Sequence, residues 1–121
     1  MNNVVLMGRL TQKPKIKSVQ GENPLTIAQY TLAVPRYYKK ANNKETDFIR
    51  CVAFGKAAEF AGKYFTQGLR IVVSGRIQTS TYLNRYNEKV YTAEVIVDIQ
   101  EFAGYIVPIE DTSEEKTIPD A

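Results

Sequence analysis

The segment DFIRCVAFGKAAE, at residues 47–59, decides the expected fold because its periodicity changes along its length. Side chains alternate across a strand, so one face of its first half carries Phe48, Arg50, Val52 and Phe54. The other face carries small apolar residues that suit a barrel interior. Apolar residues then recur at helical spacing, at Ala57, Phe60, Ala61, Tyr64 and Phe65. The segment therefore predicts a strand at 47–54 that leads into a helix at 56–66.

Four other stretches show a β-rich pattern between turn signals, at residues 3–10, 25–34, 70–82 and 90–102. Gly8 inside the first of them predicts a bend or a bulge, and a turn is expected around residues 84–88. The whole pattern predicts an all-β chain with five strands and one α-helix between strands 3 and 4. That order is typical of a five-stranded OB-fold, the oligonucleotide-binding barrel.

Charge is distributed unevenly along the 121 residues. The last twelve residues carry a net charge of −4, whereas residues 1–109 carry +7. We expect one binding domain at 1–107 and a short, acidic, disordered tail at 108–121. A basic body predicts a polyanionic partner, although a merely solvated surface would have the same composition. A tail of this charge is also expected to compete with a nucleic acid for the basic surface.

The composition argues against an enzyme. The chain has no histidine, no glycine-rich phosphate loop and no metal-ligand cluster, so neither a cofactor nor a metal is expected. The single cysteine, Cys51, lies on the predicted core face and is assigned to packing. The N-terminus lacks the features of a signal peptide, and no apolar run is long enough to span a membrane. The expected location is the cytoplasm.

Arg50 determines which face of the strand at 47–54 is expected to point outward. A buried, unpaired guanidinium is costly, so the rings on its face, Phe48 and Phe54, are expected to be exposed with it. Exposed rings beside an arginine suit the stacking of unpaired bases next to a neutralised phosphate. Alternatively, the two rings cover a second small core or a subunit interface, and Arg50 forms a salt bridge.

Further basic and aromatic residues follow the second strand and occupy the fourth strand and its loop. The candidates for binding there are Arg36, Tyr38, Lys39, Lys40, Arg70, Arg76, Tyr82 and Arg85. Lys13, Lys15 and Lys17 would share one face if their segment is extended, and Tyr30, Tyr64 and Tyr91 are assigned to packing. Aromatic and basic residues interleaved on one sheet face predict sequence-independent binding of single-stranded DNA.

The chain resembles the bacterial and phage single-stranded DNA-binding protein family between residue 3 and about residue 103. The segments that carry the resemblance are NVVLMGRL at 3–10, TLAVPRYY at 31–38, DFIRCVAFGKAAE at 47–59, GLRIVVSGRIQTSTY at 68–82 and YTAEVIV at 91–97. The resemblance implies base stacking on Tyr38, Phe48, Phe54 and Tyr82, with basic contacts from Arg50 and Lys56. It also implies a homotetramer that pairs through its first strands and acts in DNA replication, recombination and repair.

Two departures from the family pattern affect these expectations. Residues 77–80 read IQTS where many members carry two arginines, so fewer phosphate contacts are expected. Family members dock replication and repair proteins on an acidic tip that ends in Ile-Pro-Phe, and this chain ends in Ile-Pro-Asp-Ala. The missing phenylalanine argues against docking by that mode, and either a phage or mobile-element origin or a truncated C-terminus would explain it. Two alternatives share the barrel: an accessory protein of replication restart or recombination that acts through protein partners, and an RNA-binding protein.

Overall fold

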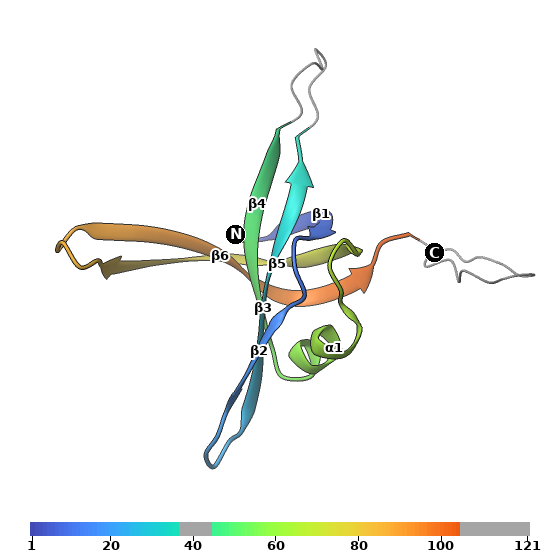
Figure 1. Ribbon diagram of the computed structural model, residues 1–121, viewed down its shortest axis with the longest axis horizontal. Helices are drawn as coiled ribbons and strands as arrows, with labels where there is room; N and C mark the ends of the chain where they lie inside the picture. The colour runs from blue at the N-terminus through green and yellow to red at the C-terminus, as the bar shows by residue number, and fades with distance from the viewer. Residues whose placement is uncertain (37–44, 105–121) are drawn as a thin grey trace, which may run out of the picture.

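The computed structural model describes residues 1–36 and 45–104, and within them six strands and one helix (Figure 1). In chain order the elements are β1 (Val4–Leu10), β2 (Lys15–Val19), β3 (Leu25–Pro35), β4 (Thr46–Phe54), α1 (Lys56–Tyr64), β5 (Arg70–Leu83) and β6 (Lys89–Phe102). The five strands expected from the sequence are present with boundaries within one residue, and the helix lies between β4 and β5 as expected. It ends two residues earlier than predicted.

The strands form one sheet that closes on itself. Their order is β1-β5-β6-β4-β3-β2, and β1 also pairs with β3 at Arg9 and Leu10, which closes the ring. The β4–β6 pairing is parallel and the other pairings are antiparallel. The prediction of an OB-fold barrel is confirmed. The β5–β6 hairpin extends well beyond the barrel as an arm, and the β2–β3 hairpin projects in a different direction (Figure 1).

Strand β2 is the element that the sequence analysis did not predict. Its five residues are all exposed, so no buried alternation marks the segment as a strand. Pairing with β3 creates it, in a register that runs from Lys15 opposite Gln29 to Val19 opposite Leu25. Both β1 and β2 lie along β3, so together they occupy the place of one interrupted first strand. Gly8 precedes the interruption, where a Cβ atom would lie 2.6 Å from the carbonyl oxygen of Ala33.

The core fills the barrel and the space under the helix. Its largest fully buried side chains are Phe65, Leu10, Leu32, Ile71, Val73 and Cys51. Helix α1 contributes Ala58 and Ala61, which are completely buried. Two members of the expected apolar stripe, Phe60 and Tyr64, are instead 36% and 53% exposed. They pack against each other on the surface with ring centroids 4.8 Å apart. The predicted apolar stripe therefore included two residues that lie on the exposed side of the helix.

A hydrogen-bonded relay ties the helix to the barrel. The Tyr30 hydroxyl donates to Oε1 of Gln100 at 2.7 Å, and Nε2 of Gln100 donates to the carbonyl oxygen of Ala57 at 2.6 Å. The relay satisfies partly buried polar groups from β3, β6 and the first turn of α1. Burial raises the pKa of Tyr30 far above its ordinary value, so this hydroxyl remains a donor at any physiological pH.

Candidate nucleic-acid interface

Strand β4 presents its aromatic residues to solvent, as the alternation predicted. Phe48 is 67% exposed and Phe54 is 42% exposed. The Arg50 side chain between them is 61% exposed. On the opposite face Cys51 and Ala53 are buried. The alternative in which the two rings cover a second core within the chain is therefore wrong.

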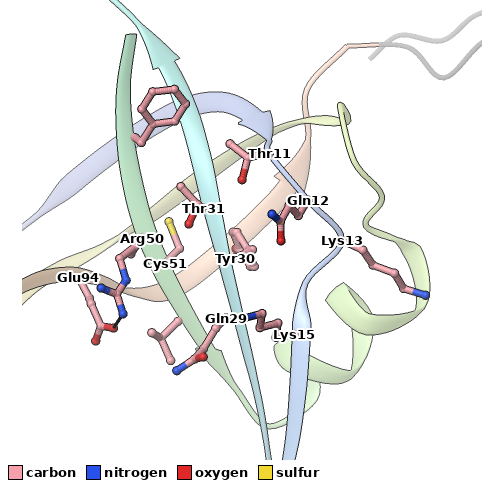
Figure 2. A pocket seen from close by; sticks show the side chains of 12 residues that line it. Thr11, Gln12, Lys13, Lys15, Gln29, Tyr30, Thr31, Arg50, Cys51 and Glu94 are labelled. Carbon is pink, nitrogen blue, oxygen red and sulfur yellow. Dashed lines mark ion pairs between the residues drawn. The ribbon is translucent and has the colours of Figure 1, made fainter.

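A groove of about 430 Å³ lies over β3, between β4 and the segment that joins β1 to β2 (Figure 2). Its lining consists of Thr11, Gln12, Lys13, Lys15, Gln29, Tyr30, Thr31, Phe48, Arg50, Cys51, Val52 and Glu94. Val52 shares the outward face of β4 but is only 6% exposed, and it lines the groove between the exposed rings. The groove therefore combines two aromatic residues, the exposed Phe48 and the buried Tyr30, with three cationic side chains, one carboxylate and uncharged polar groups.

Arg50 is held loosely within this groove. One of its terminal nitrogens lies 3.7 Å from a carboxylate oxygen of Glu94 on β6, whose side chain is 25% exposed (Figure 2). A contact of that length in a solvated groove is a weak ion pair. The guanidinium has five N–H donors in all, so it retains donors that can reach an incoming anion.

Arg36, a predicted phosphate contact, is instead bound to acidic side chains at the base of the β3–β4 hairpin. It donates to both carboxylate oxygens of Asp47, at 2.9 and 2.6 Å, and to Glu45 at 2.9 Å. The hydrogen bond from Arg36 lowers the pKa of Asp47 below its usual value. Two carboxylates compensate this guanidinium, so it is less available to a phosphate than its exposure suggests. Tyr38, Lys39 and Lys40 lie outside the described residues.

The arm carries Tyr82, which is 55% exposed on β5. Gln78 lies directly opposite Glu94, and Tyr82 follows on the same face of the strand four residues later, so this face continues the groove outward along the arm. Asn84 closes the predicted turn because its side-chain oxygen accepts hydrogen bonds from two backbone N–H groups, at 2.8 and 3.0 Å. Arg85 lies in that turn, and Arg76 donates to the Gln78 side chain at 3.2 Å.

The remaining basic candidates lie at the edges of the site. Lys56 is exposed at the first position of α1, two residues after Phe54. Arg70 lies opposite Arg9, and the strands β1 and β3 separate it from the ring of Phe48. The structure therefore brings Phe48, Arg50 and the polar groove together, with Phe54 and Lys56 beyond one end, and leaves Arg70 apart.

The structure alters two expectations from the sequence. Tyr91, assigned to packing, is 74% exposed because its strand has left the barrel and both faces of the arm meet solvent. The groove also includes polar residues that were not among the candidates for binding: Thr11, Gln12, Lys13, Lys15, Gln29 and Thr31. The alternation of lysines at residues 13, 15 and 17 indicated that Lys13 and Lys15 could share a face. That inference depended on the segment being extended.

No group of three or more metal-ligating side chains is present in residues 1–36 and 45–104. None of the helices in this described part of the chain has the length and hydrophobicity that would let it cross a membrane. Cys51 is buried, and burial raises the pKa of its thiol to about 12. A thiol of that pKa is a poor nucleophile near neutral pH.

Comparison with known proteins adds an independent line of observation. The model of the single-strand binding protein family matches residues 1–103. The single-stranded DNA-binding protein of Clostridium perfringens is 42% identical over 102 residues, which cover 84% of this chain and 65% of that protein. That of Fusobacterium nucleatum is 43% identical over 105 residues, 84% of this chain and 66% of that protein. In Staphylococcus aureus (strain Mu50), single-stranded DNA-binding protein 1 is 39% identical over 103 residues. The match spans about two thirds of the length of these relatives.

Proposed function

This chain belongs to the single-strand binding protein family, and we propose that it binds single-stranded DNA without sequence preference, through base stacking and phosphate neutralisation. The observation that carries the proposal is the exposure of Phe48, Arg50 and Phe54 on one wall of the barrel. A large ring left in solvent contributes little to folding, whereas each base stacked on such a ring contributes roughly 1–3 kcal/mol to binding. Every base has a π-face, so stacking accepts any sequence.

The site residues of the proposal are those that the sequence indicated. Stacking is assigned to Phe48, Phe54, Tyr82 and Tyr38, and phosphate contact to Arg50 and Lys56, with Arg76 and Arg85 along the arm. Lys39 and Lys40 keep their assignment from the sequence. Arg36 and Arg70 rank below the others because one is compensated by carboxylates and the other lies away from the groove.

A homotetramer is part of the proposal, and the outward face of β1 supports it. Val5, Met7 and Ile99 are 64%, 49% and 56% exposed. Register places Val5 beside Ser74, and Ser74 beside Ile99, so Val5 and Ile99 lie on one face. Residues 4–7 of β1 pair with β5 alone in the described part of the chain. An unpaired strand edge beside exposed apolar side chains is a surface that a second copy can cover.

The biological role that we propose is the protection of single strands during replication, recombination and repair, with no catalysis. The domain is proposed to span 1–107 and residues 108–121 to be an acidic tail; the end of β6 at Phe102 supports a boundary after that residue. A buried, unpaired Cys51 suits a reducing compartment, and we propose the cytoplasm. The accessory-protein alternative is not favoured, because the relatives are named as single-stranded DNA-binding proteins.

Competition binding with single-stranded DNA, RNA and duplex DNA of equal length tests the proposal. Stacking should quench tyrosine emission, which is usable because the chain has eight tyrosines and no tryptophan. Single-stranded DNA should bind most tightly, and mass measurements of free and bound protein should show four chains. Equal affinity for duplex DNA would refute the stacking mechanism. A preference for RNA would show that RNA, and not single-stranded DNA, is the ligand.

A further inference from the structure

Two lysines of β2 lie on the same outward face of the sheet as the aromatic residues of β4. Ile16, between them, faces α1: a Cβ atom at Gly62 would lie 3.1 Å from its Cδ1. Alternation along the strand therefore directs Lys15 and Lys17 to the other side, away from the helix. The direction of the two lysine side chains thus follows from the position of Ile16 and does not depend on how exposed the lysines are.

Strand register connects these lysines to the candidate interface. Lys15 is paired with Gln29, and Gln29 with Val52 in the groove. One row further on, Ile27 lies between Lys17 and Phe54. Directly paired residues share a face, so each lysine lies two strand spacings, roughly 10 Å, from β4.

Among the described residues, the surface between the lysines and β4 carries no charge that would repel a nucleic acid. The outward residues of β3 in these rows and the next are Ile27, Gln29 and Thr31. Neither Lys15 nor Lys17 forms an ion pair with a carboxylate in residues 1–36 and 45–104. Lys15 lines the groove beside Gln29 (Figure 2). Their charges, unlike that of Arg36, are therefore available to an anion.

We propose that Lys15 and Lys17 form a phosphate-binding strip on the far side of β3 from the aromatic residues. The inference rests on the proposed function and specifies the route of the ligand: a bound strand spans β2, β3 and β4. Bases stack at β4 while phosphates reach the lysines across the uncharged surface of β3. Long, flexible lysine side chains suit this role because they neutralise a phosphate without fixing its position.

The test compares full-length wild-type protein with the double variant Lys15→Gln/Lys17→Gln in binding a long oligothymidylate over a range of salt concentrations. Each lost phosphate contact in single-stranded DNA should reduce the slope of log K against log[salt] by about 0.7, so the double variant should lose about 1.4. The variant Lys15→Arg/Lys17→Arg should retain the wild-type slope. Lys63→Gln, an exposed change in the last turn of α1, is the matched control and should alter neither slope nor affinity.

The outcomes separate this inference from the proposed function. If wild-type protein binds single-stranded DNA and the double variant keeps the full slope, the lysine strip is refuted and the proposed function stands. If wild-type protein does not bind single-stranded DNA, the proposed function itself fails. Both substituted positions are exposed on an edge strand, so the variant should fold, and an unchanged thermal midpoint would verify this.

Discussion

Replacing Glu94 by glutamine should tighten the binding of single-stranded DNA. In the free protein this carboxylate lies 3.7 Å from the Arg50 guanidinium and lines the same groove. A phosphate that approaches Arg50 competes with the carboxylate for the guanidinium and is also repelled by the carboxylate. Glutamine keeps the size of the side chain and an oxygen acceptor but removes the charge. The substitution therefore isolates the electrostatic competition between Glu94 and the ligand.

The size of the effect follows from the distance and the exposure of the pair. Two unit charges at this separation attract by about 1 kcal/mol in a water-like dielectric and by about 4 kcal/mol at an effective dielectric of 20. Arg50 is 61% exposed, so the lower value applies, and measured exposed pairs contribute roughly 0.2–1 kcal/mol. We expect affinity to rise by a factor of about 1.5–5 near physiological salt. The gain should shrink toward 1 M salt, where the screening length falls to about 3 Å.

Tyrosine-quenching titrations of wild-type protein and Glu94→Gln at several salt concentrations measure this gain. Glu59→Gln, on the first turn of α1, is the matched control because it removes the same charge outside the groove. A gain shared by both variants would reflect net charge alone. Weaker binding by Glu94→Gln would refute the reasoning, because it would mean that the carboxylate supports the ligand or holds Arg50 in its binding position.

Three further perturbations test other parts of the structure. Phe48→Ala should weaken binding by about 1–3 kcal/mol at every salt concentration, with an unchanged salt slope, in the same titration; an unaltered affinity would remove Phe48 from the site. Tyr30→Phe leaves Oε1 of Gln100 without its donor and should lower the free energy of unfolding by roughly 1–3 kcal/mol in urea denaturation; an unchanged free energy of unfolding would contradict the structural role of this hydrogen bond. The Cys51 thiol, whose pKa burial raises from 9.0 to about 12, should resist iodoacetamide at pH 8 until the chain is unfolded. The folded state holds this proton more tightly, so the corresponding stabilisation is complete below about pH 9 and is lost as the pH rises toward 12; rapid labelling of native protein would contradict the buried position.

Much of the fold was predictable because burial imposes a period on the sequence. Strand β4 alternates between exposed rings and a small apolar set, and α1 begins where that period changes. The Asn84 turn was likewise visible, because its chemistry is local. Strand β2 was not predictable: it buries none of its side chains, and it exists because it pairs with β3, from Lys15 opposite Gln29 to Val19 opposite Leu25.

The site was only partly predictable because charge compensation depends on register. Arg36 and Asp47 are eleven residues apart, on opposite sides of a hairpin. Only the pairing of β3 with β4 shows that the carboxylate meets the guanidinium. The exposure of Tyr91 has a similar origin, since the alternation that buries residues within the barrel continues along an arm that has no core.

The two faces of β4 have different roles: the inner residues stabilise the barrel, and the outer residues are available for binding. Inside the barrel, Ala53 and its partner Ala28 on β3 are fully buried, and their small side chains suit the confined barrel interior. On the outer face no such volume limit operates, so Phe48 can be large without disturbing the core. A side chain that is 67% exposed contributes little hydrophobic stabilisation in the free monomer. Its size is therefore better explained by what it contacts in a complex than by the fold that carries it.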